Sequence, residues 1–176
     1  GYCAFKQKQY NKALNWFERC VPLVASRERT VAADASNRIG DCYFYARRFD
    51  EARSLYAQAV AYDPSFGDYS LFQEAFVKGL QRDYAGKIGT LNQLLTAYPS
   101  SQYLDDALYE LGRAFVLMED HSNAINRYSL LVQRYPESPL SRKAANEIGL
   151  LYCQTDQYDK AIAAYKKVIT AYPGRD

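Results

Sequence analysis

Apolar residues recur at steps of three and four along most of this chain, which is the spacing of one face of an α-helix. Residues 10–24 show the pattern, with Leu14, Phe17, Val21 and Val24 on one side. Such segments come in pairs separated by a short polar turn. Two helices of roughly 14 residues joined in this way form an antiparallel hairpin. The pattern therefore predicts an all-α protein built from helical hairpins.

A second pattern repeats at fixed offsets: a glycine, an aromatic residue, an alanine, a second aromatic residue and a proline. The copies are Gly40, Tyr43, Ala52, Tyr56 and Pro64; Gly112, Phe115, Ala124, Tyr128 and Pro136; and Gly149, Tyr152, Ala161, Tyr165 and Pro173. Copies with the same spacing indicate an array in which each unit packs against its neighbours. We predict a right-handed α-solenoid of antiparallel helical hairpins.

We expect one array over residues 1–176, with repeats of approximately 1–29, 30–66, 67–101, 102–138 and 139–176. Gly1, Ala13 and Phe17 have the spacing of residues that stand inside the other units. The first unit therefore begins in mid-pattern and is expected to be truncated. The chain is expected to be a fragment of a larger protein, with a further helix missing after the last unit.

The third unit departs from the pattern, because Lys87 stands in the alanine place. Counting back from Lys87 puts Ala75 in the glycine place and Lys78 in the place of the first aromatic residue, and we adopt this register. Counting forward from Pro64 would put Glu74 in the glycine place instead. Glycines within a helix cost about 1 kcal/mol each relative to alanine. Gly79, Gly86 and Gly89 make this unit a candidate for a bent or mobile joint.

The repeated residues resemble the tetratricopeptide repeat, whose pattern is a Leu-Gly pair, an aromatic residue, alanine, an aromatic residue and proline. Ile39-Gly40, Leu111-Gly112 and Ile148-Gly149 supply the pair. The tryptophan that opens the family pattern is replaced by Ser36, Leu108 and Ala145. The resemblance implies that glycine and alanine let two helices approach closely, that aromatic residues fill the space between hairpins, and that proline ends the second helix.

Two connections carry a narrower resemblance. The phrases AYPSSQYLDDALYELG and YPESPLSRKAANEIG are similar to repeats of bacterial periplasmic and outer-membrane-associated tetratricopeptide proteins. This implies a location in the bacterial periplasm or at the outer membrane, as part of a cell-envelope protein. A cytoplasmic location is the alternative.

Composition and charge narrow the possible partners. The 22 Lys and Arg residues are balanced by 20 Asp and Glu residues, which leaves a formal net charge of +2 with the signs interspersed. No basic stripe of the kind that binds nucleic acid is present in the sequence. No apolar run approaches the roughly 18 to 20 residues of a membrane span. We expect neither a nucleic-acid partner nor a membrane span in these residues.

The sequence offers little for catalysis. His121 is the one histidine, and it stands in the polar stretch MEDHSN between two helices. The cysteines Cys3, Cys20, Cys42 and Cys153 form neither a close pair nor a metal knuckle, so we expect buried thiols. No phosphate-binding glycine loop is found. We expect no enzyme activity, no cofactor and no metal site.

The face of each first helix that is turned away from its own hairpin lines the concave groove in the family that the repeats resemble. We therefore expect a partner-binding groove formed by residues three before, one after and four after the glycine place, with charged residues at its rim. The groove candidates are Phe5, Asn37, Arg38, Asp41, Phe44, Phe72, Phe76, Tyr109, Arg113, Asn146 and Leu150. The alternative is that some of these side chains pack against the neighbouring first helix and bind nothing.

The leading hypothesis is a non-catalytic scaffold that binds a peptide or a segment of another protein in this groove. Aromatic and arginine residues that the core does not use are typical of binding hot spots. One alternative is a structural spacer, or a module that self-associates into a homo-oligomer through the ends of the array. Another is a cytoplasmic sensor domain of a transcription regulator or kinase.

Overall fold

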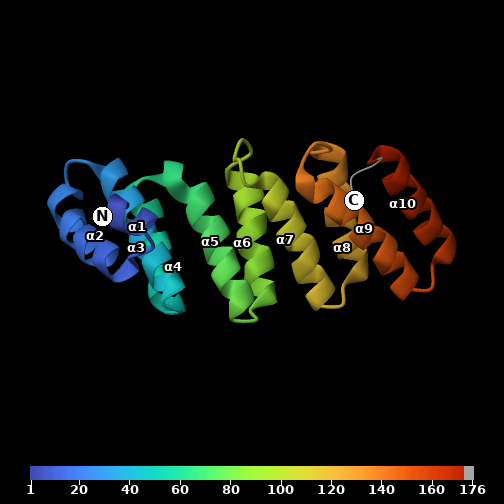
Figure 1. Ribbon diagram of the computed structural model, residues 1–176, viewed down its shortest axis with the longest axis horizontal. Coiled ribbons are helices and arrows are strands. Elements are labelled where there is room, and N and C mark those ends of the chain that lie inside the picture. Colours follow the sequence, from blue (N-terminus) through green and yellow to red (C-terminus); the bar gives the residue numbers. More distant parts are fainter. Residues whose placement is uncertain (173–176) are drawn as a thin grey trace.

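The computed structural model describes residues 1–172, which fold into helices arranged as five consecutive hairpins (Figure 1). The place predicted for Pro173 in the last repeat lies outside these residues. The hairpins are α1 (Tyr2–Lys6) with α2 (Tyr10–Val24), α3 (Arg29–Tyr45) with α4 (Phe49–Tyr62), α5 (Gly67–Leu80) with α6 (Tyr84–Ala97), α7 (Leu104–Leu117) with α8 (His121–Arg134), and α9 (Pro139–Gln154) with α10 (Tyr158–Ala171). A short 3-10 helix, η1 (Pro64–Phe66), precedes α5. The fold is an all-α solenoid of antiparallel helical hairpins.

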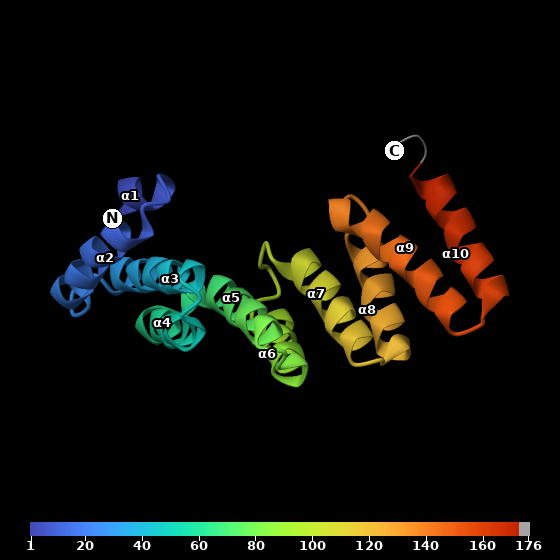
Figure 2. The same ribbon diagram turned by 60° about the horizontal axis from the view of Figure 1, so that its bottom comes forward.

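The array is curved, with the second helices of the hairpins on its outer side (Figure 2). The first helices, α1, α3, α5, α7 and α9, lie along the inner side of the curve (Figure 2). We call this side the inner face. In a solenoid each hairpin contacts only the hairpins next to it. The first helices therefore lie side by side, and the curvature makes them an extended concave surface. No helix within residues 1–172 is both long and apolar enough to cross a membrane.

Close approach between the two helices of a hairpin explains the spacing of glycine and the second aromatic residue. A Cβ atom at Gly40 would lie 2.7 Å from Cε1 of Tyr56, which is closer than non-bonded carbon atoms allow. Gly112 meets Tyr128, and Gly149 meets Tyr165, in the same way. The pair therefore fixes how near the first helix lies to the second.

In the third hairpin, an alanine and a leucine stand in the places of the glycine and the second aromatic residue. Ala75 is 1% exposed and packs in one cluster with Leu91, which is fully buried. Leucine is smaller than tyrosine, so the methyl group of Ala75 fits where the other hairpins need glycine. The register counted from Lys87 is therefore the one that the structure adopts, and Glu74 does not occupy the buried place.

Each hairpin turn contains a residue with left-handed backbone, and in the second hairpin this is Arg47, with φ of 59°. The amide of Arg47 donates to Phe44 O over 3.0 Å, and the amide of Arg48 donates to Tyr43 O over 2.9 Å. These bonds satisfy carbonyl groups that the end of a helix leaves free. The equivalent residues are Lys8, Arg82, Glu119 and Asp156.

The expectation of buried thiols holds for only one of the four cysteines. Cys42 is buried, but Cys3 is exposed, and Cys20 and Cys153 are partly exposed. Cys42 packs against the first hairpin, whereas the corresponding side of α1 has no hairpin against it within residues 1–172. The position in the repeat is the same for Cys3 and Cys42, so the neighbouring hairpin decides which of them is covered.

Candidate functional site

Aromatic rings form a continuous line across three hairpins on the inner face. Phe44 of α3 lies 6.4 Å from Phe76 of α5, and Phe76 lies 6.4 Å from Phe72, measured between ring centroids. Phe72 in turn stacks on Tyr103, just before α7, with centroids 5.2 Å apart and planes 12° apart. We call these four residues the aromatic strip. Phe76 is 37% exposed and the other three rings are partly buried, so the strip presents apolar surface to solvent.

Arg38 extends the strip toward the N-terminal end. Its guanidinium carbon lies 4.8 Å from the ring centroid of Tyr69 on α5 and 5.7 Å from that of Phe5 on α1. The same guanidinium pairs with Asp41 and, over 3.4 Å, with Asp34. Burial acts to lower the pKa of Arg38, but the charges of the two carboxylates and the hydrogen bond to the Tyr69 hydroxyl outweigh it and raise the pKa. Arg38 thus links three first helices and does not stand free at the rim.

Asn37 and Asp41 lie beneath the surface, which corrects the expectation that they line an open groove. Asn37 is fully buried, and its Oδ1 accepts a hydrogen bond from Ser70 over 2.9 Å. Asp41 is 6% exposed and accepts hydrogen bonds from the hydroxyls of Tyr56 and Tyr69. Their places in the helix are as expected, but α5 packs over them and makes them part of a buried polar joint.

The pKa values around Asp41 reflect this burial. Burial raises the pKa of the Asp41 carboxyl, although Arg38 and the two tyrosine hydroxyls act in the opposite direction. Burial and the nearby Asp41 charge raise the pKa of both Tyr56 and Tyr69. Both tyrosines therefore keep their hydroxyl protons as donors to Asp41.

A charged cluster borders the strip on the other side. The ammonium of Lys87 on α6 pairs with the carboxylate of Glu110 on α7, and both side chains are about 10% exposed or less. Arg113 Nη1 lies 2.9 Å from Glu110 Oε1, and the Arg113 side chain is 52% exposed. Lys87 Nζ also lies 5.6 Å from the ring centroid of Phe76. The cluster therefore joins the third and fourth hairpins next to the most exposed ring of the strip.

The lack of a side chain at Gly79 leaves room for the Lys87 side chain to extend from α6 toward the inner face. A Cβ atom at Gly79 would lie 3.1 Å from Lys87 Cδ and 3.2 Å from Nζ. Gly79 occupies the place of Phe44 in its own hairpin, four residues after the glycine place. A side chain there would crowd the lysine, so the two departures from the repeat pattern belong together.

The remaining predicted residues do not join the strip. Tyr109 leans against Tyr128 of its own hairpin, with ring centroids 5.6 Å apart. Burial and the Glu147 charge raise the pKa of Tyr109. Asn146 is exposed and Leu150 is 45% exposed on α9. The structure thus brings together Phe44, Phe72 and Phe76. Arg38 is linked to them through Tyr69 and Tyr103, and Arg113 belongs to the charged cluster beside Phe76.

Sequence reasoning missed Tyr69, Tyr103 and Lys87. Tyr69 and Tyr103 would have been found by continuing the same helix face for one or two turns toward the N-terminus. Lys87 stands out in the sequence as a departure from the pattern, but its consequence for the inner face depends on the side-chain path past Gly79.

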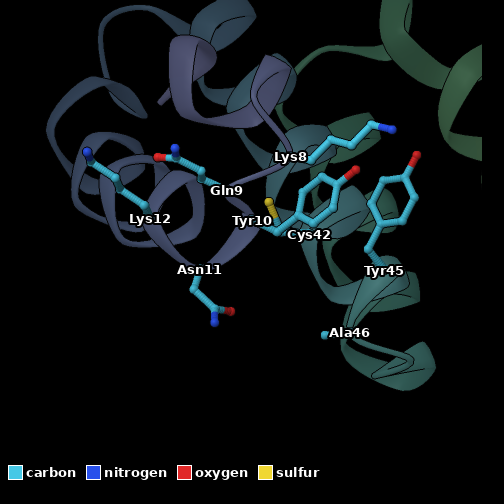
Figure 3. A pocket seen from close by; sticks show the side chains of 8 residues that line it. All are labelled: Lys8, Gln9, Tyr10, Asn11, Lys12, Cys42, Tyr45 and Ala46. Atoms are coloured by element: carbon cyan, nitrogen blue, oxygen red, sulfur yellow. The ribbon is translucent and has the colours of Figure 1, made fainter.

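A pocket of about 670 Å³ lies away from the strip, near the turns of the first two hairpins (Figure 3). Tyr10 and Tyr45 stack there with ring centroids 4.3 Å apart. Their hydroxyls and the Lys8 ammonium point to the same side (Figure 3). The pocket contains none of the predicted groove residues. Its full lining is Lys8, Gln9, Tyr10, Asn11, Lys12, Cys42, Tyr45 and Ala46.

His121 begins α8 beside Asp120, whose carboxylate accepts the amide of Asn123 and caps the helix. Among residues 1–172 there is no group of three or more histidine, cysteine, aspartate or glutamate side chains placed to hold a metal ion.

Comparison with known families identifies the class of protein. Two sequence models described as tetratricopeptide repeat match residues 1–65 and 106–176. The interval between the two matches contains the third hairpin, where lysines and alanine replace the pattern residues. Together the matches cover most of the chain, which therefore belongs to the tetratricopeptide-repeat family. No curated protein sequence gives a significant match.

Solved structures of the same fold cover almost the whole chain. A crystal structure of MamA has a TM-score of 0.78 at 16% identity and covers 100% of this chain and 93% of its own. YrrB, described as a TPR protein with an unusual peptide-binding site, has a TM-score of 0.71 at 16% identity, covering 99% and 84%. A putative kinesin light chain with TPR-like repeats from Podosopora anserina has a TM-score of 0.71 at 16% identity, covering 97% and 90%. At these identities the likeness concerns the fold alone.

Proposed function

We propose that this protein is a non-catalytic scaffold that binds a segment of another protein along its inner face. The observation that carries the proposal is the aromatic strip, which crosses three hairpins and leaves Phe76 37% exposed. Aromatic residues with arginine beside them dominate the binding energy of many protein interfaces. Arg113 supplies the exposed arginine, in the charged cluster beside the strip.

The strip is suited to a partner's apolar side chains because its own rings are already fixed. Phe72 and Tyr103 hold each other by stacking, and Phe76 lies between Phe44 and the Lys87 ammonium. A preorganised surface loses little conformational entropy when it binds. The peptide-binding site described for YrrB is a further reason to look for a peptide on this fold.

The mixed charges of the inner face favour a protein partner over a nucleic acid. Asp34 and Glu110 accompany Arg38 and Arg113 along the face. Phosphate backbones require a surface of predominantly positive charge. We therefore propose a peptide or protein segment as the partner and no nucleic acid.

The proposal is tested by selecting, from a random peptide library, the peptides that bind the purified chain. This selection assumes no particular partner sequence. Affinities of the selected peptides are then measured for the native chain and for Phe76→Ala, Phe72→Ala and Leu23→Ala. Leu23 lies on α2, away from the inner face, and is 78% exposed, so it is the matched control. We expect both phenylalanine variants to lose about tenfold or more in affinity while Leu23→Ala binds normally. Equal binding by all four chains would contradict the proposal.

We further propose that the array belongs to a bacterial cell-envelope protein of the periplasm or outer membrane. The support is the likeness of the connections before α7 and α9 to repeats of such proteins. A cytoplasmic sensor domain of a regulator or kinase is the competing assignment. The gene sequence upstream of Gly1 distinguishes them, because a secretory or lipoprotein signal supports the envelope and a DNA-binding or kinase segment contradicts it.

A further inference from the structure

A line of ring contacts connects the pocket at the turns of the first two hairpins to the aromatic strip. Tyr45, which lines the pocket, meets Phe44 of the strip edge to face, with ring centroids 5.8 Å apart. Tyr10 stacks on Tyr45, and its centroid also lies 5.7 Å from that of Phe5 on α1. Since Phe44 contacts Phe76, aromatic surface continues from the strip through Tyr45 to the pocket.

The charge of the pocket differs from that of the strip, because its lining contains two lysines and no acidic residue. Lys8 and Lys12 are exposed, and neither forms an ion pair with another group of residues 1–172. The hydroxyls of Tyr10 and Tyr45 point to the same side as the Lys8 ammonium (Figure 3). The pocket therefore presents cations and hydroxyl groups together, without a carboxylate among the residues that line it.

The turns of the other hairpins carry acidic residues in the stretch that corresponds to residues 8–12. In the second hairpin, Glu51 Oε1 lies 2.8 Å from Arg48 Nη2, so a cation of that turn is paired. Asn11 and Lys12 stand in the places of Asp50 and Glu51. The first turn thus has cations without the acidic residue that accompanies this position elsewhere. In the second to fifth hairpins the acidic residues are Asp50 and Glu51, Asp83, Glu119 and Asp120, and Asp156 and Asp159.

We propose that the pocket binds an acidic side chain of the same partner segment whose apolar side chains lie on the aromatic strip. This inference rests on the binding proposed for the strip, and it adds which charge the partner carries and where that charge lies. An aspartate or glutamate carboxylate complements the ammonium groups of Lys8 and Lys12 and accepts hydrogen bonds from tyrosine hydroxyls. The partner is therefore an apolar segment with an acidic residue at one end.

The ring contacts also limit the spacing within the partner. Tyr45 is separated from Phe76 by only two such contacts, of 5.8 and 6.4 Å. An extended chain rises about 3.3 Å per residue, so about four residues suffice to connect a side chain on Phe76 with one in the pocket. A nucleic-acid backbone fits less well, because its phosphates would continue over the inner face, where Asp34 and Glu110 stand.

Removing the charge on each side of the contact tests the proposal. Peptides selected on the native chain are sequenced, and one with an acidic residue is made again with the corresponding amide, asparagine for aspartate or glutamine for glutamate. Affinities of both peptides are measured in about 150 mM salt for the native chain, for the variant with Lys8→Gln and Lys12→Gln together, and for Lys6→Gln. Lys6 is exposed on α1 and does not line the pocket, so it is the matched control. Circular dichroism checks that each variant is folded.

The selected peptides are expected to carry an acidic residue within about five positions of an apolar one. The double lysine variant is expected to bind the acidic peptide about fivefold more weakly than the native chain does, whereas Lys6→Gln binds it normally. The amide peptide is expected to bind the native chain and the double variant alike, because the contact is already lost. Selected peptides without an acidic residue at this spacing, or an equal loss for both peptides, would overturn the proposal.

Phe76→Ala separates this inference from the proposal on which it rests. If Phe76→Ala loses the peptide while the double lysine variant binds it as tightly as the native chain, the strip is a binding surface and the acidic contact in the pocket is wrong. If Phe76→Ala binds the peptide normally, the proposed function is contradicted and this inference with it. A selection that yields no binding peptide contradicts both in the same way.

Discussion

Gly112 lies against the ring of Tyr128 so closely that a Cβ atom at position 112 would displace the ring. The two residues stand on the two helices of the fourth hairpin, sixteen positions apart in the sequence. The aromatic residue is buried because glycine makes room for it. This one contact accounts for two of the five residues that define the repeat.

Gly112→Ala is expected to lower the free energy of unfolding by about 1 to 3 kcal/mol, because the added methyl group overpacks the hairpin. Adding Tyr128→Leu should recover part of this loss, since Ala75 and Leu91 form such a pair in the third hairpin. Urea unfolding of both variants, and of Tyr128→Leu alone, measures the coupling between the two positions. Strictly additive effects would contradict the proposed contact.

Ala124→Leu tests the helix spacing at another point of the same hairpin. Ala124 is fully buried, so a leucine there is expected to cost about 1 to 3 kcal/mol of stability. Ala57 is exposed on α4, and Ala57→Leu is the matched control. An unchanged melting temperature for Ala124→Leu would count against the assigned register.

Removing one charge of the Lys87–Glu110 pair is expected to destabilise the protein much more than removing both charges. Glu110→Gln leaves the Lys87 ammonium buried with one charged partner fewer, which is expected to cost about 3 kcal/mol or more. Replacing Lys87 with methionine in that variant removes the stranded charge and should restore much of the stability. Thermal unfolding of the set measures both effects, and a double variant less stable than Glu110→Gln would contradict this view.

Thiol labelling is expected to separate Cys42 from Cys3. Burial raises the pKa of the Cys42 thiol to about 11. At pH 8 such a group is thiolate in only about one molecule in a thousand, and thiolate is the reactive form. Mass spectrometry should find Cys3 modified early and Cys42 late, and early modification of Cys42 in the folded chain would contradict its burial.

The raised pKa of Cys42 also has a consequence for stability. The unfolded chain gives up the Cys42 proton at lower pH than the folded chain does. Stability is therefore expected to fall as pH rises from the ordinary value of a thiol toward about 11. Cys42→Ala should remove this part of the pH dependence, as measured by urea unfolding across the range.

The sequence was sufficient to predict the hairpins, because Gly112, Ala124 and Tyr128 lie where the two helices of a hairpin contact each other, and their spacing follows from those contacts. It also predicted that Phe44, Phe72 and Phe76 share the inner face, since that follows from helix period alone. Burial of Asn37 and Asp41 could not be predicted in this way. It depends on how closely α5 packs on α3, which is a relation between hairpins and not within one.

The charged residues were hardest to place. A lysine in an alanine position could have pointed outward, as charged residues usually do. Lys87 instead passes Gly79 and pairs with Glu110 in the next hairpin. Long side chains have many rotamers, so their partners follow from the packed structure more than from their sequence position.

Hydrogen exchange in the presence of a selected peptide tests the central claim most directly, because it locates the bound segment on the array. Binding along the aromatic strip predicts slower exchange in α3, α5 and α7, and little change in α2, α4 and α10. The same peptide added to Phe76→Ala should give no protection at the same concentration. Protection confined to the outer helices, or to the pocket lined by Tyr10 and Tyr45, would contradict the claim that the inner face is the binding surface.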